Sequence, residues 1–185
     1  MGRWWQNLAP HLAALLLFAL LPLLMTWPLA SDLAHLFIQF GDPMLQVWTM
    51  AWDLHALLTD PAHIFNANIF YPYRNTLAYA DHLFGQAALI VPVLLVSGNA
   101  ILANNLSVLL ALALSGFTMY LLVYDLTGSR LAGVVAGVAF ASTPNRMVHI
   151  PHLNLVSAEF LPLAMPPAGR SGVTPCAGLS PWALS

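Results

Sequence analysis

The sequence contains no lysine, and its five basic residues are arginines scattered from Arg3 to Arg170. Proteins that bind nucleic acids cluster lysine and arginine on one face or in one segment. No such basic patch exists in this chain, and its net charge is -2 at pH 7. The composition therefore argues against a nucleic acid as the partner.

Cysteine is almost absent, since Cys176 is the only one in the chain. A single thiol can form neither an internal disulfide nor a thiolate metal cluster. Redox and zinc-finger functions therefore have no support, and the cellular location has to be inferred from hydropathy.

Charged residues of both signs are scarce, at 6% of the 185 residues against 59% hydrophobic residues. A soluble domain carries about a quarter charged residues. With a mean hydropathy of +0.76, the composition predicts an all-α, polytopic integral membrane protein. The 14 prolines and 11 glycines indicate several short or interrupted helices rather than one coiled coil.

The first apolar run covers residues 12–30 and carries no charge, which is enough for the roughly 20 residues that cross a bilayer core. Arg3 precedes it together with Trp4 and Trp5, a pattern typical of a cytoplasmic flank. We predict a membrane helix at about residues 10–30, with the N-terminus in the cytoplasm. A cleaved signal peptide is the alternative, but Pro28 stands where a small residue is expected before cleavage.

Residues 31–83 form the polar part of the chain. They contain five of the seven acidic residues: Asp32, Asp42, Asp53, Asp60 and Asp81. Frequent aromatic residues argue against disorder. Gln46, Thr49 and Asp53 recur at the spacing of one helical face. We therefore predict an ordered extracytoplasmic first loop with an amphipathic helix at the membrane interface.

Three further pieces of the chain are apolar. Segment 84–98 is shorter than a usual span, so it either re-enters the membrane or crosses it, whereas segment 100–124 is long enough to cross. Two more membrane helices are predicted at residues 131–145 and 153–165. Gly133 and Gly137 form a GxxxG pair on the first of these, and we expect packing within the chain rather than dimerisation.

The membrane topology depends on segment 84–98. If this segment does not cross, Arg130 lies in the cytoplasm with Arg3, while Arg146 lies outside with Asp42. The tendency of basic residues to stay in the cytoplasm favours this arrangement. A full crossing would invert everything that follows.

The last segment, 165–185, is rich in proline, glycine, serine and alanine and has no helical period. We interpret it as the truncated or frame-shifted end of a domain that spans residues 1–164. A genuine proline-rich tail is the alternative. The oligomeric state is not predicted by any feature of the sequence.

Asp42 lies in the run Gly41-Asp42-Pro43 at the start of the amphipathic helix. Aspartate before proline is a good helix N-cap, and Asp60 with Pro61 repeats the pattern. A carboxylate at the interface is also suited to act as general base on a hydroxyl, or to hold a metal bound to a phosphate. Both interpretations stay open at this point.

Arg146, His149 and His152 follow a predicted membrane helix. Arginine offers a forked donor for phosphate, and protonated histidines add further donors. The alternative is that these residues only anchor a helix end at the interface. Pro151 interrupts the helix between the two histidines and makes a shared metal unfavourable.

Several motifs resemble those of bacterial GT-C-type membrane glycosyltransferases over about residues 10–163. In the loop they are Gly41-Asp42-Pro43, Trp48, Trp52, Asp60-Pro61 and segments 65–72 (FNANIFYP), 75–78 (NTLA) and 81–82 (DH). Later they are segments 104–105 (NN), 115–116 (SG), 126–130 (LTGSR), 144–154 and 161–163 (LPL).

The resemblance implies a mannosyltransferase-like enzyme in a bacterial plasma membrane. It would transfer a sugar from a polyprenyl-phosphate donor to an acceptor on the extracytoplasmic face. Asp42 would be the catalytic base, although it lacks the acidic neighbour that completes a pair in that family, and Arg146, His149 and His152 would bind the substrate. The expected partners are the lipid bilayer and the lipid-linked donor, and the cofactor is left open, with a divalent cation as one alternative.

Two other functions remain as alternatives. A transporter would use the pieces around Pro92 and Gly98 as broken helices along a substrate path. Such a protein would need buried charges, and segment 84–123 contains none. The other alternative is an inactive, truncated remnant, which the composition of the last segment favours.

Overall fold

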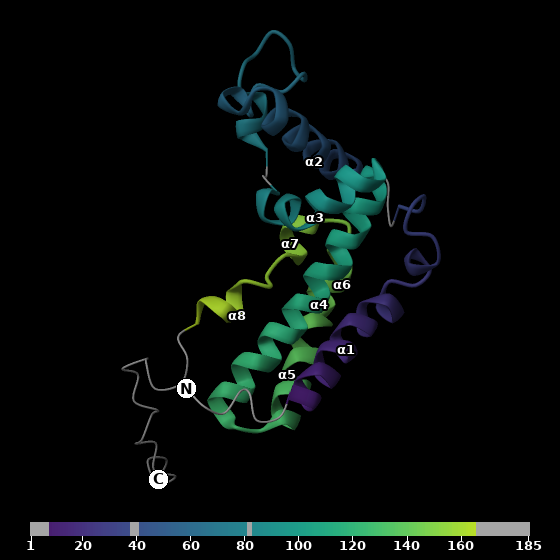
Figure 1. Cartoon of the computed structure of the whole chain (residues 1–185), viewed down its shortest axis with the longest axis vertical. Coiled ribbons are helices and arrows are strands. Elements are labelled where there is room, and N and C mark those ends of the chain that lie inside the picture. Colours follow the sequence, from purple (N-terminus) through teal and green to yellow (C-terminus); the bar gives the residue numbers. More distant parts are fainter. Residues whose placement is uncertain (1–7, 38–40, 81–82, 166–185) are drawn as a thin grey trace, which may run out of the picture.

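The computed structural model describes residues 8–37, 41–80 and 83–165, and within these ranges all regular structure is helical (Figure 1). The α-helices are α1 (Leu8–Met25), α2 (Asp42–Thr59), α3 (Phe84–Ser97), α4 (Ala100–Thr127), α5 (Arg130–Ala141), α6 (Pro144–Val148), α7 (Leu153–Val156) and α8 (Leu161–Ala164). The 3-10 helices are η2 (Leu29–Ser31), η3 (Pro61–His63) and η4 (Thr76–Tyr79). The all-α class is therefore confirmed. The predictions for Arg3, for Asp81-His82 and for residues 166–185 lie outside the described residues.

Helix α4 is the central element of the molecule. It has 28 residues and is therefore about 42 Å long. It starts where the Asn99 side chain accepts a hydrogen bond from the Leu102 amide at 3.0 Å, and it ends at Gly128 with φ +71°. Glycine adopts this left-handed conformation at little cost. Helices α1, α2, α3, α5, α7 and α8 all pack against α4.

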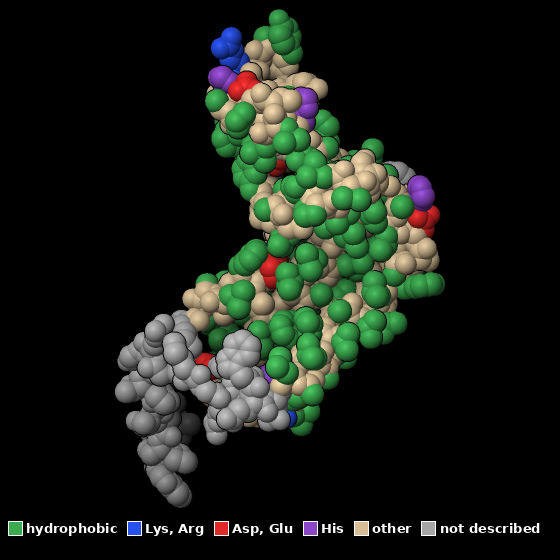
Figure 2. Space-filling view, in the orientation of Figure 1, with side chains coloured by type: hydrophobic (Ala, Val, Ile, Leu, Met, Phe, Trp, Pro, Cys, Tyr) green, Lys and Arg blue, Asp and Glu red, His purple; other side chains and the backbone are tan. Residues whose placement is uncertain are grey.

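Two helices, α1 and α4, are long and apolar enough to cross a membrane. They are antiparallel, because His11 near the start of α1 contacts Tyr120 near the end of α4. Helix α1 buries only Ala14, Phe18 and Pro22. Its leucines are mostly exposed, and apolar side chains cover much of the face shown in Figure 2. A continuous apolar surface of this kind indicates contact with lipid or with another protein.

Helix α1 ends at Met25, earlier than the predicted end at residue 30. Proline has no backbone N–H, and its ring disfavours a helical conformation at the preceding residue. Pro28 therefore stops the helix, and the chain continues into the short helix η2.

Glycines allow α1, α4 and α5 to approach closely. The buried ring of Phe18 lies against Gly116 of α4 and Gly137 of α5, where a Cβ atom on either glycine would overlap it. A Cβ on Gly133 would lie 2.8 Å from the carbonyl oxygen of Tyr120. The predicted role of Gly133 and Gly137 in packing within the chain is confirmed.

Helix α3 lies beside the first half of α4. Its 14 residues span about 21 Å, which is less than the roughly 30 Å of a bilayer core. Its buried face joins a core cluster with residues of α2, α4 and α7. Gln86 near its start lies beside Ser107 and Ala111 of α4, and the helix ends at Gly98 next to the start of α4. This position is the one expected of a segment that does not cross the membrane. That α3 does not cross stays a prediction.

The helix predicted at residues 131–145 is confirmed over residues 131–141, but it ends before Pro144, where α6 begins. Helix α5 ends at Ala141, and Thr143 is extended, with φ -57° and ψ 140°. A residue before proline is driven out of the helical region by contact with the proline ring. The 12 residues of α5, about 18 Å, are also too few to cross a bilayer core.

The continuous helix predicted at residues 153–165 is wrong. Only the four-residue helices α7 and α8 form there, and a turn separates them. Pro162 lies in the first turn of α8, where its missing N–H is tolerated, so it begins a new helix instead of continuing the old one. The turn between the two helices buries Glu159.

Helix α2 is amphipathic as predicted, but its polar face is turned inward. Thr49 and Asp53 are 2% and 0% exposed. The exposed large side chains of the helix are Met44, Leu45, Leu57 and Leu58. An outward apolar face and an inward polar face suit apolar surroundings better than water.

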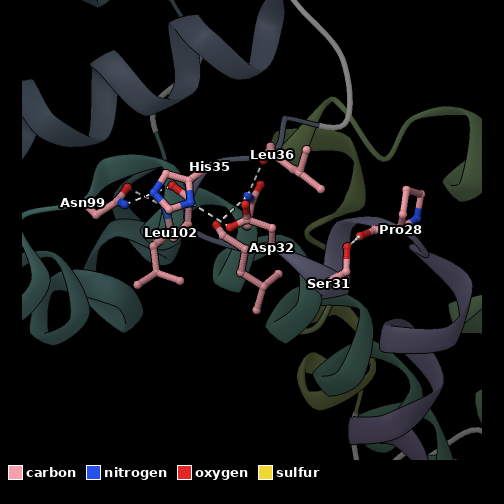
Figure 3. Close-up of polar contacts among 10 residues, drawn as sticks. Pro28, Ser31, Asp32, His35, Leu36, Asn99 and Leu102 are labelled. Atoms are coloured by element: carbon pink, nitrogen blue, oxygen red, sulfur yellow. Dashed lines mark hydrogen bonds and ion pairs between the residues drawn. The ribbon is translucent and has the colours of Figure 1, made fainter.

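The connection after α1 is held against α4 by two asparagines (Figure 3). Asn105, which is 1% exposed, donates to the carbonyl oxygens of Leu33 at 2.9 Å and of Leu36 at 2.7 Å. Asn99 donates to the carbonyl oxygen of Ala34 at 3.0 Å. These bonds fix the path of the chain that leads towards α2.

The substitution Asn105→Leu is expected to destabilise the fold by about 2 kcal/mol, because each hydrogen bond contributes about 1 kcal/mol. Thermal denaturation of the detergent-solubilised protein, followed by size-exclusion chromatography, measures the effect. Asn104→Leu is the matched control, because Asn104 is equally buried and its Oδ1 has no hydrogen-bond partner. Equal loss of stability in both variants would contradict the role of Asn105.

Candidate functional site

A cleft of about 400 Å³ opens where α2, the segment after η4 and the start of α7 meet. Its lining consists of Asp42, Leu45, Gln46, Thr49, Tyr79, Ala80, Leu83, His152 and Asn154. Three segments that are distant in the sequence therefore contribute to it. Its size is within the range of small-ligand sites, and it combines apolar side chains with a few polar groups.

Asp42 and His152, both predicted as site residues, meet in this cleft. The Asp42 Oδ2 atom lies 2.8 Å from His152 Nε2. The carboxylate is in the first turn of α2, where the positive end of the helix dipole favours a negative charge. The structure therefore joins two residues that the sequence only suggested separately.

The interpretation of Asp42 as a helix N-cap is wrong. Gly41 occupies the N-cap position with φ +112°, a conformation that favours glycine, and no side chain caps the helix. Asp60 makes no capping bond either, and it instead accepts a hydrogen bond from His63 Nδ1 at 2.9 Å. The carboxylate of Asp42 is therefore not used to cap the helix.

The two ring nitrogens of His152 have different surroundings. Nε2 lies 2.8 Å from the Asp42 Oδ2 atom, whereas Nδ1 is buried and has no hydrogen-bond partner among the described residues. The inaccessible Nδ1 cannot take a proton from a ligand, but the Asp42 side chain is 61% exposed. The carboxylate is thus the group positioned to act as a base, and the imidazole orients it.

Helices α2 and α7 are also joined below this pair. The Leu153 amide donates to Gln46 Oε1 at 3.3 Å. Leu153 is fully buried and shares a core cluster with Met50 of α2 and Ile150. Both members of the pair are therefore attached to the same packed core.

His149 and Arg146, the other two predicted site residues, do not line the cleft. The His149 ring contacts that of His152, with centroids 5.6 Å apart, and its Nδ1 donates to the Asn145 carbonyl oxygen at 2.7 Å. Arg146 is buried, with its guanidinium 4.3 Å from the centre of the Phe140 ring. Neither residue is therefore part of the cleft lining.

Arg146 is electrostatically linked to Glu159, a residue that the sequence reasoning did not consider. Burial lowers the pKa of the Arg146 guanidinium, and the Glu159 carboxylate raises it. Glu159 is 1% exposed and accepts a hydrogen bond from Gln86 Nε2 at 3.2 Å. The one available signal was composition, because Glu159 is the only glutamate in the chain.

The other aspartate–histidine pairs lie on the surface. Asp32 accepts from His35 at 2.9 Å, and Asp60 accepts from His63 at the same distance. Exposed pairs of this kind contribute little to stability. Within the described ranges, no group of three His, Cys, Asp or Glu side chains has the arrangement to hold a metal ion.

No protein-family model, curated protein or solved structure matches this chain. The groups that line the cleft therefore define the chemistry that it can perform. The cleft offers one accessible carboxylate, one imidazole in contact with it, and amide and hydroxyl groups around them. This set can bind a polar ligand and accept a proton from it.

Cysteines at positions 42 and 152 are expected to be linked by a short bifunctional thiosulfonate, because the two side chains are in contact. The variant is Asp42→Cys with His152→Cys on a Cys176→Ser background, and mass spectrometry of the digested protein detects the linked peptides. Arg74→Cys with His152→Cys is the control, since Arg74 is exposed and does not line the cleft. Absence of the 42–152 link, or equal linking in the control, would refute the arrangement.

Proposed function

We propose that the chain is the N-terminal part of a GT-C-like membrane glycosyltransferase. It transfers a sugar from a polyprenyl-phosphate donor to an acceptor on the extracytoplasmic face of a bacterial plasma membrane. The observation that carries the proposal is the contact between Asp42 and His152 in an open cleft. The family resemblance implied Asp42 as the catalytic base, the chemistry of histidine suggested His152 as a substrate-binding residue, and the two come from distant parts of the chain.

The chemistry assigned to the cleft is a single displacement at the sugar's anomeric carbon. The Asp42 carboxylate takes the proton of the acceptor hydroxyl as the acceptor oxygen bonds to that carbon. The bond to the phosphate oxygen breaks, and the polyprenyl phosphate leaves as an anion. The His152 ring, whose Nε2 lies 2.8 Å from the Asp42 Oδ2 atom, holds the carboxylate in position.

The arrangement of the helices supports a cleft on one side of the membrane. Helices α1 and α4 are antiparallel, and Arg130 follows the far end of α4, whereas the cleft lies at the end where α4 begins. In this topology the N-terminus and Arg130 are cytoplasmic. Phe18 of α1 fills the notch between Gly116 and Gly137, which favours a retained helix over a cleaved signal peptide.

A transporter is the second candidate, and one observation favours it. Asp53, Arg146 and Glu159 are all buried inside the helical structure. Intramembrane or buried ionisable groups are frequent along substrate paths. The two functions differ in their dependence on Asp42, because a transporter needs no base at the surface of the cleft.

Labelling of intact cells with a membrane-impermeant maleimide tests the topology. Single cysteines at exposed positions Tyr73, Leu131 and Val148 are introduced on a Cys176→Ser background. Labelling at 73 and 148, but not at 131, is the expected pattern. Permeabilised cells provide the control, since position 131 should then react. Labelling of 73 and 131 without 148 would place Asp42 and His152 on opposite sides and exclude the mechanism.

The substitution Asp42→Asn is expected to lower sugar transfer about 100-fold or more, which is the usual contribution of general base catalysis. Transfer is measured in isolated membranes supplied with radiolabelled polyprenyl-phosphate mannose or glucose. Asp60→Asn is the matched control, because Asp60 also pairs with a histidine but lies outside the cleft. Unchanged transfer in Asp42→Asn, with wild-type activity present, would rule out Asp42 as the base.

A further inference from the structure

We propose that the cleft binds a neutral sugar ring of the acceptor, with Tyr79 as the surface on which the ring stacks. The donor phosphate would then bind elsewhere. This inference rests on the proposed function, which left the ligand of the cleft and the role of Tyr79 open. Three features of the lining carry it: its charge, its hydrogen-bonding groups and the position of the Tyr79 ring.

The charge of the lining disfavours a phosphate. Among the described residues that line it, Asp42 is the only acidic one and none is an arginine. Within the described ranges the arginines are Arg74, Arg130 and Arg146, and the chain has no lysine that could replace them. A phosphate beside Asp42 would be repelled by a like charge. A ligand without charge meets no such repulsion.

The hydrogen-bonding groups of the lining match hydroxyl groups. Asp42 offers acceptor oxygens. Gln46 uses its Oε1 to accept from the Leu153 amide, so its Nε2 remains as a donor. A sugar hydroxyl both donates and accepts, so it can satisfy a carboxylate and an amide at once. Leu45 and Leu83 add apolar contacts for the C–H groups of the ring.

Tyr79 is 92% exposed although the backbone that carries it is fixed. Helix η4 is anchored by Leu77, whose side chain is fully buried and whose amide donates to the Phe65 carbonyl oxygen at 3.1 Å. The Ala80 amide donates to the Leu77 carbonyl oxygen at 3.1 Å, which closes the turn after Tyr79. Tyr79 is therefore an exposed aromatic residue on a fixed turn that lines the cleft.

An aromatic face and a sugar ring are complementary surfaces. The face of a tyrosine ring is apolar and carries a partial negative potential. One face of a pyranose ring presents C–H groups, which are apolar and slightly positive, while its hydroxyls point outward. Stacking on Tyr79 would leave those hydroxyls directed towards the Asp42 and Gln46 side chains that share the cleft. The acceptor hydroxyl would then lie within reach of the carboxylate that takes its proton.

The test measures ligand binding separately from transfer. The protein in lipid nanodiscs is titrated with methyl mannopyranoside and methyl glucopyranoside, and saturation-transfer NMR gives the dissociation constants. The variants are Tyr79→Ala, Tyr79→Trp and Asp42→Asn. Tyr71→Ala is the matched control, because Tyr71 is equally exposed but lies outside the cleft.

We expect at least one of the glycosides to bind, and Tyr79→Ala to weaken it by about tenfold, as the loss of one aromatic contact does. Tyr79→Trp should retain binding, Tyr71→Ala should not change it, and Asp42→Asn should weaken it, because the carboxylate accepts from a sugar hydroxyl. Absence of glycoside binding, or an equal loss in Tyr71→Ala, would overturn the inference. Displacement of the glycoside by inorganic phosphate or by ethylammonium at similar concentrations would also overturn it, by identifying an ionic ligand.

The two proposals fail in different ways. Glycoside binding that depends on Tyr79, in a protein without transfer activity, would leave a carbohydrate site and refute the transferase. Transfer that depends on Asp42, with an acceptor KM unchanged in Tyr79→Ala, would leave the transferase and refute the stacking role.

Discussion

Two side-chain amides of α4 and its N-cap, those of Asn105 and Asn99, hold the chain that follows the first helix. Backbone carbonyl groups that lie against an apolar helix need a donor, because leaving one unpaired costs about 1–3 kcal/mol. Asn105 uses both of its amide hydrogens for this purpose, on Leu33 and Leu36. Residues 33–36 can therefore lie against α4. The position of Asp42, and with it the cleft, depends on this attachment.

Buried charge is the second constraint on the cleft. A buried charge is costly unless an opposite charge or a hydrogen-bond partner lies nearby. Arg146 and Glu159 influence each other, and Glu159 is also bonded to Gln86 of α3. His152 lies between them in the sequence, so the segment that carries it has a buried charge on either side. This attachment limits how far His152 can move from Asp42.

The parts of this structure that the sequence predicted are those governed by local rules. Apolar runs identified α1 and α4, the spacing of polar residues identified α2, and Gly133 with Gly137 indicated close helix packing. Hydropathy predicted continuous helices around Pro144 and Pro162. It does not register that proline ends one helix and begins another.

The candidate site was predicted less completely, because it depends on contacts between distant segments. Asp42 and His152 were named, but their contact could not be derived from either segment alone. Arg146 was expected at a surface and is buried, since an apolar chain can pack around an arginine that has Phe140 and Glu159 nearby. The spacing of polar residues predicted a polar face on α2. It could not show that Thr49 and Asp53 on this face would be buried, because spacing does not reveal which neighbours a face contacts.

The notch that receives Phe18 has a consequence for how the protein is made. Helix α1 leaves the ribosome first, but the two glycines that accept its aromatic ring lie on α4 and α5 and are synthesised much later. Helix α1 can pack on α4 as soon as α4 has formed, because most of its contacts are with that helix. The Phe18 ring reaches its final packing only after Gly137 of α5 has been synthesised.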